Sequence, residues 1–245
     1  KFYLKDESTD LHAYNTLDGG EGNDTLILDN KGLGGATIRN IENLVVNAGG
    51  AGVDYDMSLF ATSFTLNGGS AKLTNVAGQK LVTDNATSLI VNMAAGQTSV
   101  DLTSQNRGVV DQTFTLKGDS LTSVKLAMDE GDKKVNFTGS GDVKVTDLAI
   151  TATVSEAKDD KAQVDATVLD ELANVTVAGA GAVQLTVGVN GKLKAVNATE
   201  NTGGVTVDLS DADNAAFTGG AGADTLTVKG SKVAHTLGAG DDTVV

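Results

Sequence analysis

The sequence predicts an all-β protein that folds as a parallel β-helix, or β-solenoid, with glycine-rich calcium-binding turns. Three observations carry this prediction. A glycine–aspartate phrase recurs after 18 residues, strand-like tripeptides with alternating polarity recur along the chain, and the composition is rich in Gly, Thr and Val with no Pro. Short strands joined by tight turns suit this composition better than long helices do.

The recurring phrase lies near the C-terminus. Residues 219–227 read GGAGADTLT and residues 237–245 read LGAGDDTVV. Gly220, Gly222 and Asp224 of the first phrase therefore recur 18 residues later as Gly238, Gly240 and Asp242. A third copy, GGEGNDTLI, occupies residues 19–27. These phrases match a nonapeptide of β-helices, G-G-x-G-x-D followed by an apolar position, whose stacked turns bind calcium. Two nonapeptides make one coil, so the spacing predicts a coil period.

The chemistry of the phrase explains a calcium site. Glycine accepts positive φ and close backbone approach, which lets a tight turn direct its carbonyl groups inward. Calcium prefers six to eight oxygen ligands, and carbonyls with an Asp carboxylate supply them. The alternative is that these Gly–Asp turns connect strands without any metal. The copy at residues 19–27 predicts at most a half-site, because no second copy lies one coil away.

Composition and charge narrow the possible functions. The 245 residues suffice for one long solenoid or two compact domains, and the absence of Cys excludes disulfides and thiolate sites. The formal net charge is −14 with 18 Lys and Arg, which disfavours nucleic-acid binding. This acidity fits either divalent counter-ions or solubility through self-repulsion. No apolar run is long enough to span a membrane. The chain opens without Met or a signal peptide and ends in a strand-like phrase, which predicts a fragment of a longer protein.

Strand-like tripeptides alternate apolar and polar residues, which places one side of each strand toward a core. A solenoid is favoured over a sandwich because the strands are short, the apolar residues are small and uniform, and there is no Trp. The repeating apolar positions are expected to form one continuous core, among them Leu26, Leu44, Leu66, Leu116, Val177 and Leu226. The predicted strands are centred on residues 44–46, 64–66, 89–91, 114–116, 124–126, 143–145, 175–177, 185–187 and 205–207.

Three regions follow from these patterns. We expect a calcium-type turn with the first coils in residues 1–35, an irregular solenoid body in 36–216, and calcium-binding coils in 217–245, all within one continuous elongated unit. Coil length in the body varies, so the sequence does not define its register. The charged, Gly-free stretch 155–164 predicts a protruding loop or a short helix, and residues 168–172 a helical turn or an irregular start of a strand.

No catalytic motif stands out. His12 and His235 lie far apart and outside any metalloprotease pattern, and His235 is expected on a strand surface. Carboxylates cluster at 54–56, 129–132 and 208–213, where each cluster could hold a calcium ion. Asp residues that cap turns are the commoner explanation of such clusters. The expectation is therefore a protein without enzymatic activity.

The three glycine phrases resemble the repeats-in-toxin (RTX) nonapeptides of proteins exported by Gram-negative type I secretion. The Thr-, Val-, Asn- and Ala-rich body, with phrases such as IENLVV at 41–46 and FTGGAGADTL at 217–226, resembles RTX-type bacterial surface-layer (S-layer) proteins. One departure is Leu237, which stands where the nonapeptide has its first Gly. The resemblance implies calcium ligands at the carboxylates of Asp24, Asp224 and Asp242 and at the carbonyls of Gly20, Gly22, Gly220, Gly222, Gly238 and Gly240.

The resemblance also implies a secreted protein of the bacterial cell surface that assembles with itself into a calcium-dependent S-layer. Lipopolysaccharide or another surface polysaccharide would be bound through other regions. The alternative function is a secreted RTX-type adhesin or glycan-binding surface protein. A third possibility, a polysaccharide lyase or epimerase, has no motif in its favour.

Overall fold

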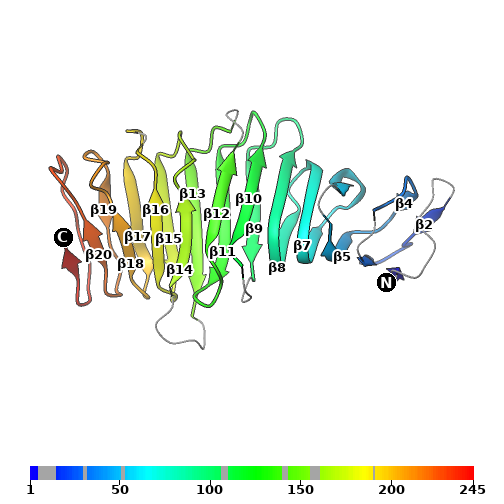
Figure 1. The fold of residues 1–245 in the computed structure, drawn as a ribbon, viewed down its shortest axis with the longest axis horizontal. Helices are drawn as coiled ribbons and strands as arrows, with labels where there is room; N and C mark the ends of the chain where they lie inside the picture. The colour runs from blue at the N-terminus through cyan, green and yellow to red at the C-terminus, as the bar shows by residue number, and fades with distance from the viewer. Residues whose placement is uncertain are drawn as a thin grey trace.

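The computed structural model shows an elongated parallel β-solenoid whose coils stack from the N-terminus to the C-terminus (Figure 1). The structure describes residues 1–4, 15–29, 32–50, 53–105, 110–139, 143–154, 161–189 and 191–245. Within these ranges the helical content is one 3-10 turn, η1 (Met57–Leu59). The predicted fold class, a parallel all-β solenoid, is confirmed.

The strands are short except for two that each continue around a corner. Their bounds are β1 (Phe2–Leu4), β2 (Thr16–Asp18), β3 (Thr25–Asp29), β4 (Thr37–Arg39), β5 (Asn43–Gly49), β6 (Asp54–Asp56), β7 (Ser63–Val76), β8 (Lys80–Met93), β9 (Ser99–Ser104), β10 (Gln112–Lys117), β11 (Ser123–Asp129), β12 (Val135–Gly139), β13 (Asp147–Thr153), β14 (Ala162–Ala166), β15 (Asn174–Gly179), β16 (Val183–Val187), β17 (Ala195–Asn201), β18 (Val205–Asp208), β19 (Ala216–Thr218), β20 (Thr225–Thr227) and β21 (Thr243–Val244).

Two stacks of parallel strands face each other across the core. The first sheet contains β1, β3, β5, the first halves of β7 and β8, and then β9, β11, β13, β15, β17 and β19. The second sheet contains β6, the second halves of β7 and β8, and then β10, β12, β14, β16, β18, β20 and β21. Strands β2 and β4 pair separately near the N-terminus.

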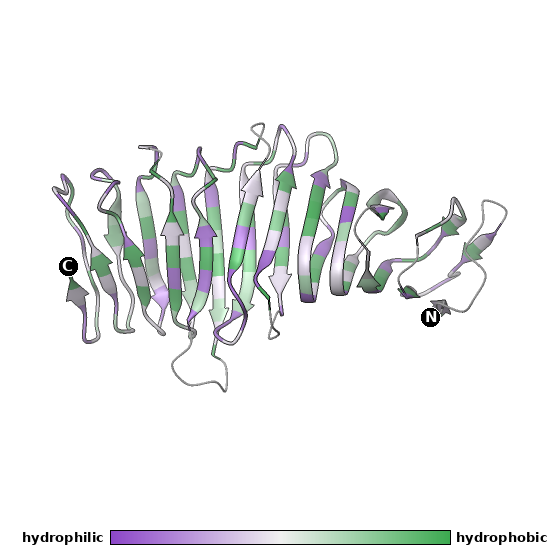
Figure 2. Ribbon diagram, viewed as in Figure 1, coloured by the Kyte–Doolittle hydropathy of each residue, from purple (hydrophilic) through white to green (hydrophobic). Residues whose placement is uncertain are grey.

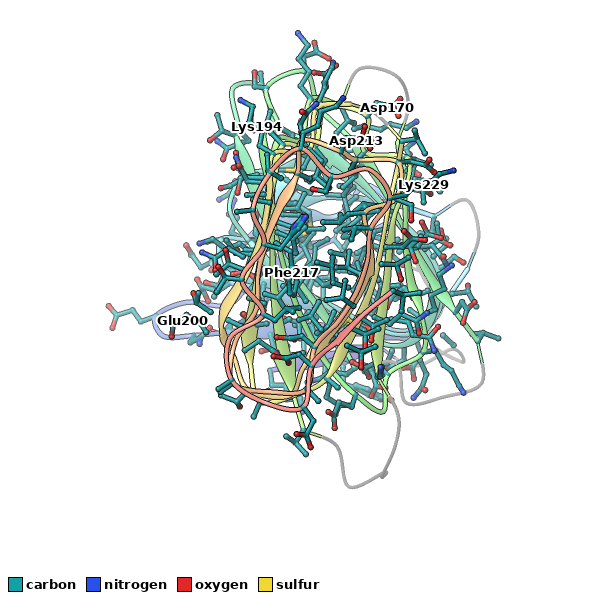
Figure 3. All side chains as sticks on the ribbon, turned by 90° about the vertical axis from the view of Figure 1, so that its left-hand side faces the viewer. Asp170, Lys194, Glu200, Asp213, Phe217 and Lys229 are labelled. Atoms are coloured by element: carbon teal, nitrogen blue, oxygen red, sulfur yellow. The ribbon has the colours of Figure 1, made fainter. Side chains whose placement is uncertain are left out.

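The core lies between the two sheets. Apolar and polar residues alternate along the strands, as the colouring of Figure 2 shows, so one side of each strand faces inward. All six predicted core positions are buried, with exposures of 0–1%. Phe114 and Phe137 pair in register on neighbouring coils, and their rings stack with centroids 6.2 Å apart. In the end-on view of Figure 3, Phe217 lies between the sheets.

Coil length varies along the body, as the sequence indicated. Ser63 pairs with Lys80, 17 residues on, whereas Asn136 pairs with Asp165, 29 residues on. The register comes from strand pairing, and the extra residues lie in the corners between strands. Consequently the coils stay aligned even though the loops differ in length.

Some local predictions need correction or stay open. Residues 143–145 do not form a strand, because they make the corner that leads into β13, although Val145 is buried. Residues 168–172 form a turn whose Leu169 and Leu172 face the core. Most of the charged stretch 155–164 lies outside the described residues, and its last part belongs to β14.

Candidate functional site

The two C-terminal glycine phrases form stacked corners of the solenoid. Thr225 pairs with Thr243 and Leu226 with Val244, so the second sheet advances by 18 residues per coil here. The corner at residues 219–224 connects β19 to β20, and the corner at 237–242 connects the next coil to β21. The coil period predicted from the phrase is therefore confirmed at this end.

Close packing explains the glycines. A Cβ atom on Gly238 would lie 2.1 Å from the carbonyl oxygen of Gly220, and one on Gly240 would lie 2.5 Å from that of Gly222. Gly238 and Gly240 also have φ values of +91° and +124°, which L-residues with side chains rarely adopt. The two corners thus lie glycine on glycine, with backbone in direct contact.

Asp224 is the buried carboxylate of this corner, with 1% of its surface exposed. Its Oδ1 accepts the amide N–H of Val205 at 2.6 Å, and its Oδ2 accepts that of Gly220 at 3.1 Å. The amide N–H of Asp224 in turn donates to Oδ1 of Asp242, at 2.9 Å. Each carboxylate therefore contacts the backbone of the preceding coil, and the two aspartates form a ladder along one edge.

The electrostatics of this ladder are unfavourable for two bare carboxylates. Burial raises the pKa of Asp224, the amides of Val205 and Gly220 partly offset this, and the nearby charge of Asp242 raises the pKa further. Among the described residues, no Lys or Arg forms an ion pair with Asp224. A cation at this edge would remove part of the repulsion.

Asn201 closes the preceding corner without a carboxylate, and sequence reasoning missed it. Its side-chain amide donates to the carbonyls of Gly179 and Gly181, while its Oδ1 accepts the amides of Gly203 and Gly204. It is 1% exposed. The Asn followed two residues later by Gly-Gly was the available signal, since such a pair needs a side chain to satisfy its amides.

The N-terminal phrase has a partner that the sequence prediction lacked. Thr25 pairs with Asn43, again 18 residues on, and the amide of Asp24 donates to Oε2 of Glu42 at 2.7 Å. Glu42 therefore occupies the position relative to Asp24 that Asp242 occupies relative to Asp224. An acidic residue at 18-residue spacing, directly before a strand, was the signal for it.

The N-terminal corner is nevertheless less completely stacked. A Cβ on Gly19 would lie 1.9 Å from the carbonyl oxygen of Asn40, but one on Gly20 or Gly22 would meet nothing within 4 Å among the described residues. The reason is that the six-residue corner 19–24 lies against a corner of three residues, 40–42.

The two groups of phrases lie on opposite long edges of the solenoid. The corner at 19–24 leads into β3 of the first sheet, whereas the corner at 219–224 leads from the first sheet into β20 of the second. Because each coil turns at both edges, these corners cannot share one column of ions. The predicted ligands form one ladder at 224 and 242 and a separate site at 24.

The residues present fit a hard cation through oxygen ligands. The buried carboxylate of Asp224 and the half-buried carboxylate of Asp242 lie one coil apart at corners built of stacked glycines, and carboxylate and carbonyl oxygens are the ligands that calcium prefers. Both oxygens of Asp224 already accept amide hydrogens, so carbonyls would have to provide most of the coordination. Within the described ranges, no group of three or more His, Asp or Glu side chains is placed to hold a metal. The calcium ligands stay a prediction.

The other acidic clusters cap turns. Asp208 accepts the amide of Ser210, Asp56 that of Ser58 and Asp129 that of Gly131, at 2.8, 3.0 and 2.7 Å. These hydrogen bonds agree with the expectation that the Asp residues of these clusters cap turns.

Of the two histidines, the structure describes His235 alone. His235 is half-buried just outside a strand, where its Nδ1 accepts the amide of Phe217 at 3.1 Å. Instead of lying on a strand surface as expected, His235 accepts a hydrogen bond from the backbone of the preceding coil. His12 lies outside the described residues.

Comparisons with protein-family models, with curated proteins and with solved structures find no match for this chain. In the described part of the chain, no helix has the length and apolar character needed to cross a membrane.

Proposed function

We propose that this chain is the structural, self-assembling part of a calcium-dependent bacterial surface layer of the RTX type, secreted to the cell surface. The observation that carries the proposal is the ladder of Asp224 and Asp242. Two carboxylates one coil apart, the first buried with a raised pKa, lie at stacked glycine corners along one edge of the solenoid.

Calcium, when bound, would supply positive charge and bridge oxygen ligands of neighbouring coils. The residues that would hold it are Asp224 and Asp242, with the carbonyls of the stacked glycines. The carboxylate of Asp224 is already oriented, because it accepts hydrogen bonds from the amides of Val205 and Gly220. An ion that binds only the folded state stabilises it by mass action.

The solenoid provides the surfaces that a lattice needs. Its two sheets present long, regular outer faces, and its two edges differ in chemistry, so copies could pack side by side in one orientation. A net charge of −14 also means that copies repel each other until divalent cations bind. Calcium would thus stabilise both the C-terminal coils and the contacts between molecules.

Calcium titration tests the metal part of the proposal. Isothermal titration of the purified chain should show calcium binding, and the double variant Asp224→Ala with Asp242→Ala should bind fewer ions. A matched control replaces the turn-capping residues Asp56 and Asp208 by Ala, which should leave the stoichiometry unchanged. Unchanged stoichiometry and affinity in the Asp224 and Asp242 variant would show that the calcium assignment is wrong.

Electron microscopy tests the assembly part separately. Adding calcium to the dialysed chain should produce two-dimensional arrays, and chelation should dissolve them. If calcium binds but only monomers remain at all concentrations, the surface-layer function is wrong while the metal site stands. Binding of cell-surface glycans without arrays would favour the adhesin instead.

A further inference from the structure

A groove on the outer face of the second sheet holds polar side chains that the calcium ladder does not use. It is a hollow of about 230 Å³ over strands β16, β18 and β20. A second hollow of about 300 Å³ adjoins it and shares Val189, Asp211 and Ala212 with it. Asp213, which lines the second hollow, lies at a long edge of the solenoid, away from the core (Figure 3).

The floor of the groove is a set of hydrogen-bonding side chains in strand register. Gln184 pairs with Thr206, and Asp208 pairs with Thr227, so the polar groups repeat at the spacing of neighbouring strands, about 4.8 Å. Thr186 completes the floor. Amide, hydroxyl and carboxylate groups thus offer both donors and acceptors in a regular array.

One acceptor in this floor is already oriented. Oδ1 of Asp208 accepts the amide and the hydroxyl of Ser210, which fixes the carboxylate and lowers its pKa. Its Oδ2 has no hydrogen-bond partner among the described residues, and Asp208 is one of the residues that line the hollow. A fixed carboxylate is a strong acceptor for hydroxyl groups of a ligand, since little orientation entropy remains to be lost.

The wall of the groove is apolar. Val187 ends strand β16 and packs partly against the core, and Val189, two residues further on, is 74% exposed. An exposed aliphatic side chain beside a row of hydroxyl-binding groups matches a ligand with one C–H face and several hydroxyl groups. The ammonium group of Lys161 donates to the hydroxyl of Thr206 at 2.7 Å, but the two carboxylates of Asp208 and Asp211 leave the groove with a net negative charge, which disfavours an anionic ligand.

We infer that this groove binds a neutral oligosaccharide, with hydroxyl groups of consecutive sugar rings on the polar floor and a ring face against Val189. The described lining contains no aromatic side chain, so a single groove should bind weakly, with a dissociation constant on the order of 1 mM. In an array, many grooves on one surface would raise the avidity by about 10²–10⁴. The inference does not depend on the proposed calcium site.

Nuclear magnetic resonance titration of the isotope-labelled chain tests this groove. The probes are the neutral trisaccharides maltotriose, cellotriose and mannotriose, with anionic trigalacturonate as the charge control. At least one neutral probe should shift the signals of residues 184–189, 206–212 and 227 saturably, and trigalacturonate should not. Absence of saturable shifts with all three neutral probes, or equal saturable shifts with trigalacturonate, would overturn the inference.

Substitutions locate the binding site. Replacing Thr186 and Thr227 by Val removes two hydroxyl groups with little change in shape and should weaken binding at least about tenfold. Thr176→Val, on the outer face of the first sheet, is the matched control and should bind as the wild type does. If the double variant loses its fold by circular dichroism, the exposed Gln184→Ala variant replaces it. Equal affinity in the floor variant and the control would overturn the assignment.

Discussion

Replacing Asp224 by Ala should destabilise the C-terminal coils, and the loss should grow when calcium is present. The substitution leaves the buried amide of Val205 and the partly buried amide of Gly220 without their acceptor. A buried donor without a partner costs about 1–3 kcal/mol, which gives about 2–6 kcal/mol for two. Removing a buried carboxylate whose pKa is raised offsets part of this. We therefore expect a net loss of about 2–4 kcal/mol in EDTA.

Calcium should widen the difference between wild type and variant. At a hundredfold excess over its dissociation constant, a bound ion adds about 2.7 kcal/mol to the wild type. The Ala variant should lack most of this gain, so its deficit should increase by nearly that amount. Urea denaturation in EDTA and in calcium measures both quantities, and Asp208→Ala provides an exposed turn-capping control whose smaller loss should not depend on calcium.

Hydrogen exchange gives the residue-specific check. In EDTA, the amides of Val205 and Gly220 should exchange much faster in the Asp224→Ala variant than in the wild type. If these amides keep their wild-type protection, the hydrogen bonds attributed to Asp224 do not exist in solution. If the deficit of the variant is the same in EDTA and in calcium, the stability argument for a metal at this corner fails.

Three further predictions concern the core, the glycine corner and acid. Val177→Asp buries an unpaired charge and should destabilise by several kcal/mol, whereas Thr176→Asp, on the outer side of the same strand, should cost little; equal urea midpoints would refute the inward assignment. Gly220→Ala would place a Cβ 1.9 Å from the carbonyl oxygen of Asn201 and should destabilise the fold by about 1–3 kcal/mol or more, measured as a fall in Tm. The control is Gly230→Ala, whose Cβ would meet nothing within 4 Å, so that its loss of stability reports only the strain of a φ of +67°. The pKa of Asp224 is higher in the folded chain than in the unfolded chain, so folding favours its protonated form. In EDTA, acidification toward about pH 4 should therefore raise the free energy of unfolding of the wild type relative to that of Asp224→Asn. A relative stability that falls with acidification would contradict the burial of this carboxylate.

Local patterns were sufficient to predict the fold class. Alternating polarity in short segments indicates strands with one buried side, and the absence of Pro leaves every backbone amide free to pair. Such a pattern does not depend on distant residues, which is why the core positions Leu26, Leu116 and Leu226 were predicted correctly. The segment 143–145 failed because the same pattern also occurs in a corner whose valines face the core.

The sequence by itself determined the 18-residue coil period at the phrases, the core-facing positions and the candidate ligands Asp24, Asp224 and Asp242. These depend on neighbours along the chain or on a fixed spacing. Only the tertiary structure decided the register of the body, the roles of Glu42 and Asn201, and the placement of the phrases on opposite edges. Corners of different length absorb a different number of residues in each coil, so strand pairing between distant segments, rather than spacing, decides which side chains meet.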